Sequence, residues 1–143
     1  MGLLTDFFVA KPEAITPEVV DAGPHGTFPT AQLKNVDVVK IATLEGIACE
    51  GQVGDAAARI PEATAEAEHG EAWVFPIAAR LASRLAGADE GELKRIGEAW
   101  AKTEEFRLDG WGPRDVVEAL TAIAALARNA QANGGGLFLW MCL

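Results

Sequence analysis

The sequence predicts a single α+β domain over residues 1–143, with about five helices packed on a small sheet and the C-terminal strand 137–143 at its centre. Residues 3–10 combine aromatic and β-branched types over the length of one strand. Residues 137–143 are seven apolar residues without a charge after a glycine turn, which is typical of a strand buried on both faces. In the stretches between them, apolar residues recur at intervals of three and four, which is the helical period.

Two short elements are predicted after the first strand. Thr16 is a good N-cap and Pro17 suits the first helical position, so a short helix is expected over 16–22. Residues 28–34 are expected to form an edge strand, because a proline within them removes one donor of the hydrogen-bond ladder.

The next helix is expected to begin after Asp37, to follow an apolar stripe and to end at Gly51. Residues 52–70 are rich in Ala, Glu and Gly, which predicts a mostly exposed connection with at most a short helix. Residues 73–75 form a compact apolar group before Pro76.

Three further helices are predicted in the second half, each with a recognisable start or stop signal. These signals are, in chain order, Gly87, the capping box Asp89–Glu92, the start at Pro113 or Asp115, and the stop at Asn133-Gly134.

Charge and composition exclude several classes of function. The 143 residues carry 21 acidic and 12 basic side chains, a formal net charge of -9. No run of Lys and Arg exceeds two residues, so we expect neither nucleic acid nor an anionic membrane as a partner. No apolar stretch approaches the length of a membrane span, and residues 1–6 lack the features of a secretion signal. The expected location is the cytoplasm.

The negative charge is concentrated in one segment. Residues 41–79 contain seven acidic side chains and one basic one, Arg59, and so hold six of the nine net negative charges. A segment of this kind either steers a basic partner by long-range attraction or only keeps the protein soluble.

The layout of the chain resembles the YfbM-like family of small bacterial proteins. The resemblance rests on a Met-Gly start, a strand ending in Phe-Phe-Val-Ala, the sequence Asp37-Val-Val-Lys40 at a helix start, and Gly-Trp-Gly-Pro-Arg-Asp-Val-Val before a long helix and an apolar last strand. The family often shows Trp-His where this chain has Ile41-Ala42. The resemblance implies an α+β fold and carries no activity with it.

Catalytic and metal-binding motifs are poorly represented. The single serine, Ser83, lies in an apolar helical repeat, and Cys49 is not part of a nucleophile signature. Glu66, Glu68 and His69 supply only half of a di-iron motif, so no metal is expected. No phosphate-binding glycine motif is present, and we expect no cofactor.

The segment 104–113 holds the candidate binding residues Glu104, Arg107, Asp109 and Trp111. Functional groups concentrate on loops that rigid elements support, and Arg107 offers a planar fork for a carboxylate. The alternative is that Arg107 pairs with Glu104 or Asp109 and ties the loop over a buried Trp111. We expect this second arrangement, because large aromatic side chains are buried on average.

Three functions remain as hypotheses. The first, which we favour, is a non-enzymatic acidic binding or inhibitor module that recognises a basic protein. The second is a small enzyme or small-molecule binder with a cleft near Trp111, and the third is a structural homo-oligomer.

Overall fold

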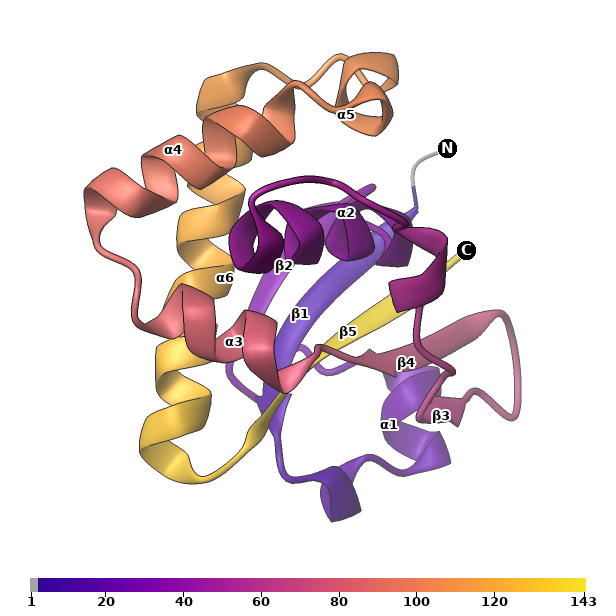
Figure 1. Ribbon diagram of the computed structural model, residues 1–143. Coiled ribbons are helices and arrows are strands. Elements are labelled where there is room, and N and C mark those ends of the chain that lie inside the picture. Colours follow the sequence, from indigo (N-terminus) through magenta and orange to yellow (C-terminus); the bar gives the residue numbers. More distant parts are fainter. Residues whose placement is uncertain (1–2) are drawn as a thin grey trace.

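The computed structural model describes residues 3–143, so the Met-Gly start of the chain lies outside the described residues. Five strands form the sheet, and six α-helices and two single-turn 3-10 helices connect them within this range (Figure 1). The strands are β1 (Leu4–Ala10), β2 (Thr30–Lys34), β3 (Ala65–Glu66), β4 (Ala72–Pro76) and β5 (Gly136–Cys142). The helices are α1 (Pro17–Ala22), α2 (Val38–Glu50), α3 (Ala79–Ala86), α4 (Glu90–Ala101), α5 (Glu104–Leu108) and α6 (Pro113–Asn133), with 3-10 turns at Pro12–Ala14 and Ala57–Arg59.

The sheet is antiparallel throughout and has the strand order β2-β1-β5-β4-β3. The C-terminal strand therefore lies in the middle, as its uncharged apolar sequence predicts. The strands nearest the two termini are neighbours, with Leu4 opposite Cys142 and Ala10 opposite Gly136. The predicted edge strand is also confirmed, since β2 pairs only with β1.

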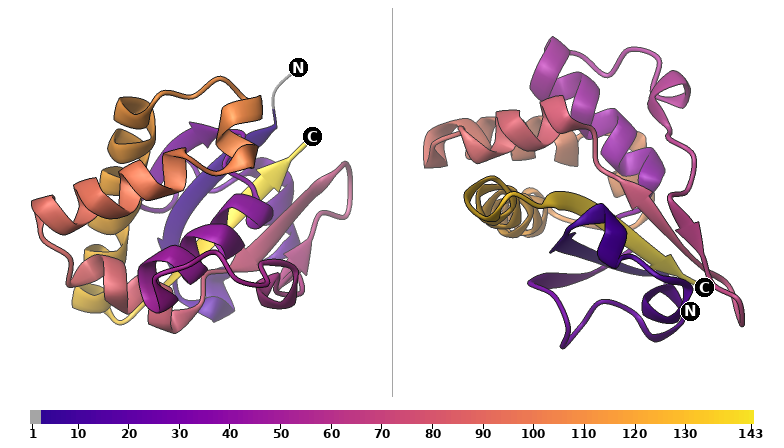
Figure 2. Two further views of the ribbon diagram at one scale, coloured as in Figure 1. Left: turned by 45° about the horizontal axis from the view of Figure 1, so that its top comes forward. Right: turned by 90° about the horizontal axis from the view of Figure 1, so that it is seen from below.

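Helices α2 to α6 cover one face of the sheet, and α1 with the loop that follows it covers the other (Figure 2). The larger core lies under α2 to α6 and includes Phe7, Leu120 and Leu139, all fully buried. The smaller core lies on the second face, where Phe8 and Trp140 pack against α1 and its loop. Alternation along each strand separates the two sets, because successive side chains point to opposite faces.

Local capping signals set most helix boundaries as expected. The Thr16 side chain accepts a hydrogen bond from Val19 at the start of α1, and the Asp37 side chain accepts one from Lys40 at the start of α2. Gly51 ends α2 with a positive φ of 77°, which favours glycine. The capping box at the start of α4 is formed on both sides.

Two elements differ from the sequence-based expectation. Part of the expected connection 52–70 is β3, whose two residues pair with Val74 and Trp73 of β4. Part of the expected loop 104–113 is the short helix α5. Within residues 3–143, no helix has the length and apolarity needed to cross a bilayer.

Candidate functional site

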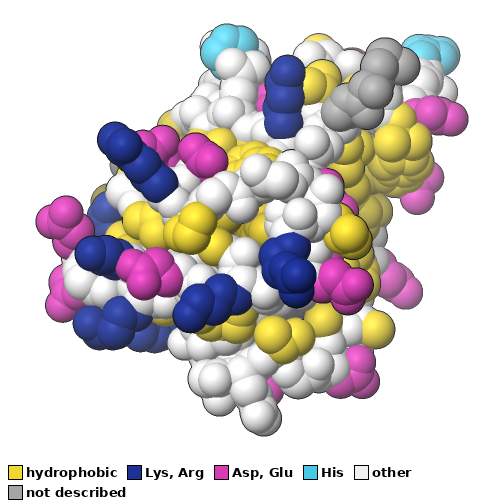
Figure 3. All heavy atoms as spheres, turned by 90° about the horizontal axis from the view of Figure 1, so that it is seen from above, with side chains coloured by type: hydrophobic (Ala, Val, Ile, Leu, Met, Phe, Trp, Pro, Cys, Tyr) yellow, Lys and Arg dark blue, Asp and Glu magenta, His cyan; other side chains and the backbone are white. Residues whose placement is uncertain are grey.

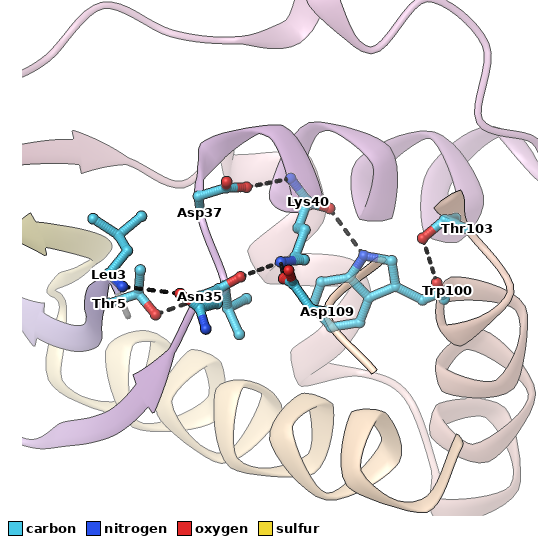
Figure 4. A network of polar contacts seen from close by, with 9 residues as sticks. Leu3, Thr5, Asn35, Asp37, Lys40, Trp100, Thr103 and Asp109 are labelled. Atoms are coloured by element: carbon cyan, nitrogen blue, oxygen red, sulfur yellow. Dashed lines mark hydrogen bonds and ion pairs between the residues drawn. The ribbon is translucent and has the colours of Figure 1, made fainter. Parts of the chain in front are cut away.

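Lys40, on the first turn of α2, is a buried cation at the junction of α2 and the α5–α6 connection (Figure 4). Its ammonium group donates to the Asp109 carboxylate and to the backbone carbonyl of Asn35. The ammonium nitrogen also lies 5.1 Å from the centre of the Phe106 ring. A buried charge requires such partners, because water does not solvate it there.

Three aromatic side chains connect the Lys40 site with the larger core. Trp111 packs against Phe106 with ring centres 5.3 Å apart, and Phe106 meets Trp100 edge-on at 4.8 Å. The indole nitrogen of Trp100 donates to the backbone carbonyl of Lys40 over 2.9 Å. The connection between α4 and α6 is therefore held to α2 in two ways. Asp109 pairs with Lys40, and the aromatic cluster is joined to α2 by the hydrogen bond of Trp100.

The same network extends to the start of the sheet. Asn35 has a positive φ of 59° in the turn after β2, and its side chain accepts a hydrogen bond from the backbone of Leu3. The hydroxyl of Thr5 on β1 accepts one from the backbone of Val36. The turn that presents a carbonyl to Lys40 is thus fixed on both sides.

The four residues predicted from the segment 104–113 have separate positions. Asp109 joins Lys40, and Trp111 is half-buried in the aromatic stack. Glu104 and Arg107 are exposed and form no ion pair with any residue of 3–143. The expected internal pair of Arg107 with Glu104 or Asp109 is replaced by the pair of Asp109 with Lys40. This side of the molecule carries mixed charges, with basic and acidic side chains interspersed around α4 and α5 (Figure 3).

The acidic segment 41–79 divides into two parts. Glu45 and Glu50 on α2 both accept hydrogen bonds from Arg80, over 2.8 and 2.6 Å, and Glu50 also accepts one from Arg59 over 3.0 Å. Hydrogen bonds from Arg80 and, to a smaller extent, from Arg59 lower the pKa of the Glu50 carboxyl below its ordinary value. These two carboxylates are neutralised within the fold.

The other five acidic side chains of the segment are exposed and form no ion pair with any residue of 3–143. Asp55 lies in the loop after α2. The remaining four lie on or beside the β3–β4 hairpin at one edge of the sheet, and we call them the acidic edge. They are Glu62, Glu66, Glu68 and Glu71.

The hairpin that carries the acidic edge is tied to the second face of the sheet. Ala65 and Ala67 pack against the smaller core, so the alternating residues Glu66 and Glu68 point away from it. The backbone nitrogen of His69 donates to the carboxylate of Asp21 on α1 over 3.0 Å. The row of glutamates thus stands on ordered backbone.

Two of the larger clefts lie on the helical side. One of about 490 Å³ adjoins Trp111 and is lined by Asp115 and Glu118 rather than by the predicted Glu104 and Arg107. The larger, of about 690 Å³, runs between α4 and α6 over Leu93 and other apolar side chains. The charged side chains of the larger cleft are all exposed, so none of them is desolvated toward a ligand.

A third cleft contains a residue that the sequence reasoning missed. Asp6 on β1 is only 5% exposed, and it lines a cleft of about 470 Å³ together with Trp140 and Gln32. Burial raises the pKa of the Asp6 carboxyl, and the neighbouring Gln32 and His25 only partly oppose this shift. The signal in the sequence was a single acidic residue in the stretch Leu-Thr-Asp-Phe-Phe-Val-Ala, which is otherwise uncharged.

The residues considered for metal and thiol chemistry do not assemble into a site in the part of the chain that is described. Glu66, Glu68 and His69 belong to no group of three or more potential metal ligands within residues 3–143. Both cysteines are free. Burial raises the pKa of the Cys49 thiol, which disfavours its nucleophilic thiolate form.

Fold and sites together define a small α+β protein with an antiparallel sheet, an ion pair between a buried lysine and a partly exposed aspartate, an acidic sheet edge and a cleft over a buried aspartate. No family model, no curated protein and no solved structure matches the chain.

Proposed function

We propose that this chain is a non-enzymatic binding module that recognises a basic protein partner through the acidic edge. The observation that carries the proposal is the split of the acidic segment. Two of its seven carboxylates are paired with Arg80 and Arg59, whereas four of the unpaired ones, Glu62, Glu66, Glu68 and Glu71, lie on or beside one hairpin.

Electrostatics and geometry both support this surface as a contact region. Unpaired carboxylates of one sign attract a basic surface over a distance and increase the rate of association. The carboxylates of the acidic edge lie at the lateral edge of the sheet. There β3 pairs only with β4, and an edge strand leaves the backbone groups of its outer side available. An extended basic segment would meet backbone partners and carboxylates at the same place. Membership of the YfbM-like family is a further part of the proposal and assigns no activity.

The test uses charge reversal at the acidic edge. Wild-type protein captures partners from the native lysate at low and high salt, and the affinity of the partner identified by mass spectrometry is then measured with purified proteins. The double variant Glu66→Lys with Glu68→Lys should weaken binding by about tenfold or more at low salt and reduce its salt dependence.

The matched control carries the same charge change on the helices at the other side of the molecule. Glu98 and Glu118 are exposed residues of α4 and α6, and Glu98→Lys with Glu118→Lys should leave the affinity nearly unchanged. Equal loss in both double variants would mean that only net charge matters, and it would refute the acidic edge as the contact surface.

A further inference from the structure

Asp6 occupies an unusual position for a carboxylate. It lies on β1 in the interior of the sheet, directly between Gln32 of β2 and Trp140 of β5. Its side chain lies on the face of the sheet that α1 covers, because Phe8, two residues along the strand, belongs to the smaller core on that face. The chain at Gly23 and His25, after α1, borders the cleft above it.

The charge of Asp6 is only partly compensated within the fold, by the neighbouring Gln32 and His25. The residue is 95% buried and forms no ion pair with any residue of 3–143. Burying a carboxylate without a cationic partner costs stability, and an apolar side chain would fill the same place at no such cost. Lys40, which is also buried, has a carboxylate partner instead. A buried carboxylate without an ion-pair partner, at the floor of a cleft, suits the binding of a cation.

The walls of the cleft are shaped for a small ligand. The indole nitrogen of Trp140 donates to the backbone carbonyl of Val20 over 2.8 Å, so the ring that lines the cleft is fixed in place. Gly23 has a φ of +85°, and a Cβ atom there would lie 3.3 Å from the Trp140 ring. Glycine therefore allows the chain to pass close above the indole. The volume of about 470 Å³ is in the range of small-molecule sites.

Basic groups stand at the rim rather than at the floor. Lys34 lies on the same face as Gln32, two residues further along β2, and is therefore diagonal to Asp6 at roughly 7–8 Å between strand positions. His25 reaches the cleft from the loop. Both rim residues are exposed. A ligand that carries only an ammonium group would be repelled by these two basic side chains. A ligand that also carries an anionic group would be attracted by them.

We propose that this cleft binds a small zwitterion of the amino-acid type, with its ammonium group at Asp6 and its carboxylate at Lys34 and His25. Trp140 packs along the aliphatic part and offers its ring to the ammonium group. This site is separate from the acidic edge and does not depend on the function proposed for it.

The experiment titrates isotope-labelled protein with γ-aminobutyrate and with ε-aminocaproate, which differ in the spacing of their charges, and follows assigned amide and indole signals by NMR. Saturable shifts are expected at the Trp140 indole and the Gly23 amide. The Trp100 indole, on the opposite side of the sheet, should not shift and is an internal control. n-Butylamine and butyrate, which each lack one charge, should bind about tenfold more weakly or worse.

Asp6→Asn removes the charge and keeps the shape, so it tests the floor of the cleft without endangering the fold. It should weaken binding of the zwitterion by about tenfold or more, while Asp55→Asn, the same change at an exposed loop position, should have no effect. Lys34→Ala should also weaken binding and shift the preference toward n-butylamine. The double variant Glu66→Lys with Glu68→Lys should bind the zwitterion as the wild type does.

Two results would overturn the proposal. One is the absence of saturable shifts at Trp140 and Gly23 with both zwitterions. The other is equal affinity of the wild type and Asp6→Asn, which would show that the carboxylate does not take part. Because no protein partner is needed, failure here would leave the acidic edge untouched, and failure of the charge-reversal test would leave this cleft untouched.

Discussion

Removing the carboxylate of Asp109 should destabilise the protein more than removing the ammonium group of Lys40, although the two form one ion pair. The Lys40 side chain is 4% exposed, and that of Asp109 is 34% exposed. In Asp109→Asn the ammonium group stays in the interior with the Asn35 carbonyl and the Phe106 ring as partners. In Lys40→Met the apolar stem is kept, and the remaining carboxylate is reached by water.

The difference in exposure sets the magnitudes. Breaking a fully buried pair by removing one partner costs about 3–5 kcal/mol. Because water reaches the place of Asp109, we expect Asp109→Asn to lower the free energy of unfolding by about 2–3 kcal/mol. Lys40→Met deprives the Asn35 carbonyl of a donor and should cost about 1 kcal/mol. For a chain of this size these losses correspond to decreases in Tm of about 8 °C and about 3 °C.

The assay is urea unfolding at neutral pH of the wild type, both single variants and the double variant, followed by tryptophan fluorescence and circular dichroism. In the Lys40→Met background, Asp109→Asn should cost less than about 0.5 kcal/mol, because the buried charge it would strand is gone. A greater loss for Lys40→Met than for Asp109→Asn would refute the reasoning, as would an equal cost of Asp109→Asn in both backgrounds.

Three further changes test other parts of the structure by the same unfolding measurement. Trp140→Ala should cost about 3–5 kcal/mol, because a nearly buried indole and its hydrogen bond are lost, and a cost below about 1 kcal/mol would contradict its place in the smaller core. Trp111→Ala should cost about 2 kcal/mol by removing one end of the aromatic stack, whereas Arg107→Ala should stay within about 0.5 kcal/mol. Asp6→Asn should raise stability at neutral pH: the raised pKa of Asp6 means that the native state binds the proton more tightly, so wild-type stability falls as pH rises from the ordinary carboxyl range through that raised value. Profiles of stability against pH that coincide for the two proteins would contradict this.

Local signals account for the parts of the fold that could be predicted. The N-caps at Thr16 and Asp37 and the capping box of α4 act within one helical turn, and the apolar run of β5 reports burial on both faces. β3 was missed because its two residues, Ala65 and Glu66, have no strand signal of their own and are ordered by pairing with β4. The helix α5 was missed because it is short and lies beside a glycine-rich loop.

The site residues show the same division between local and long-range causes. Trp111 was expected to be buried beneath its loop, and the structure places it half-buried against the larger core. The partner of Asp109 could not be predicted, because Lys40 lies 69 residues earlier and nothing near either residue encodes the contact. Asp6 was visible as a lone acid in an apolar strand, but only the sheet order shows that it lies between two neighbouring strands.

Two of the buried charged residues, Lys40 and Asp6, are expected to affect stability in opposite directions, and this difference distinguishes a structural charge from a functional one. Lys40 is matched by Asp109, so loss of its partner should weaken the fold. Asp6 is unmatched within residues 3–143, so loss of its charge should strengthen the fold. A substitution at a ligand site commonly stabilises the free protein and weakens its function, because the native side chain there has its full set of partners only when the ligand is bound. If Asp6→Asn gains stability and loses the zwitterion together, the carboxylate is there for the ligand. If it gains stability and keeps the zwitterion, the buried charge serves neither packing nor this ligand.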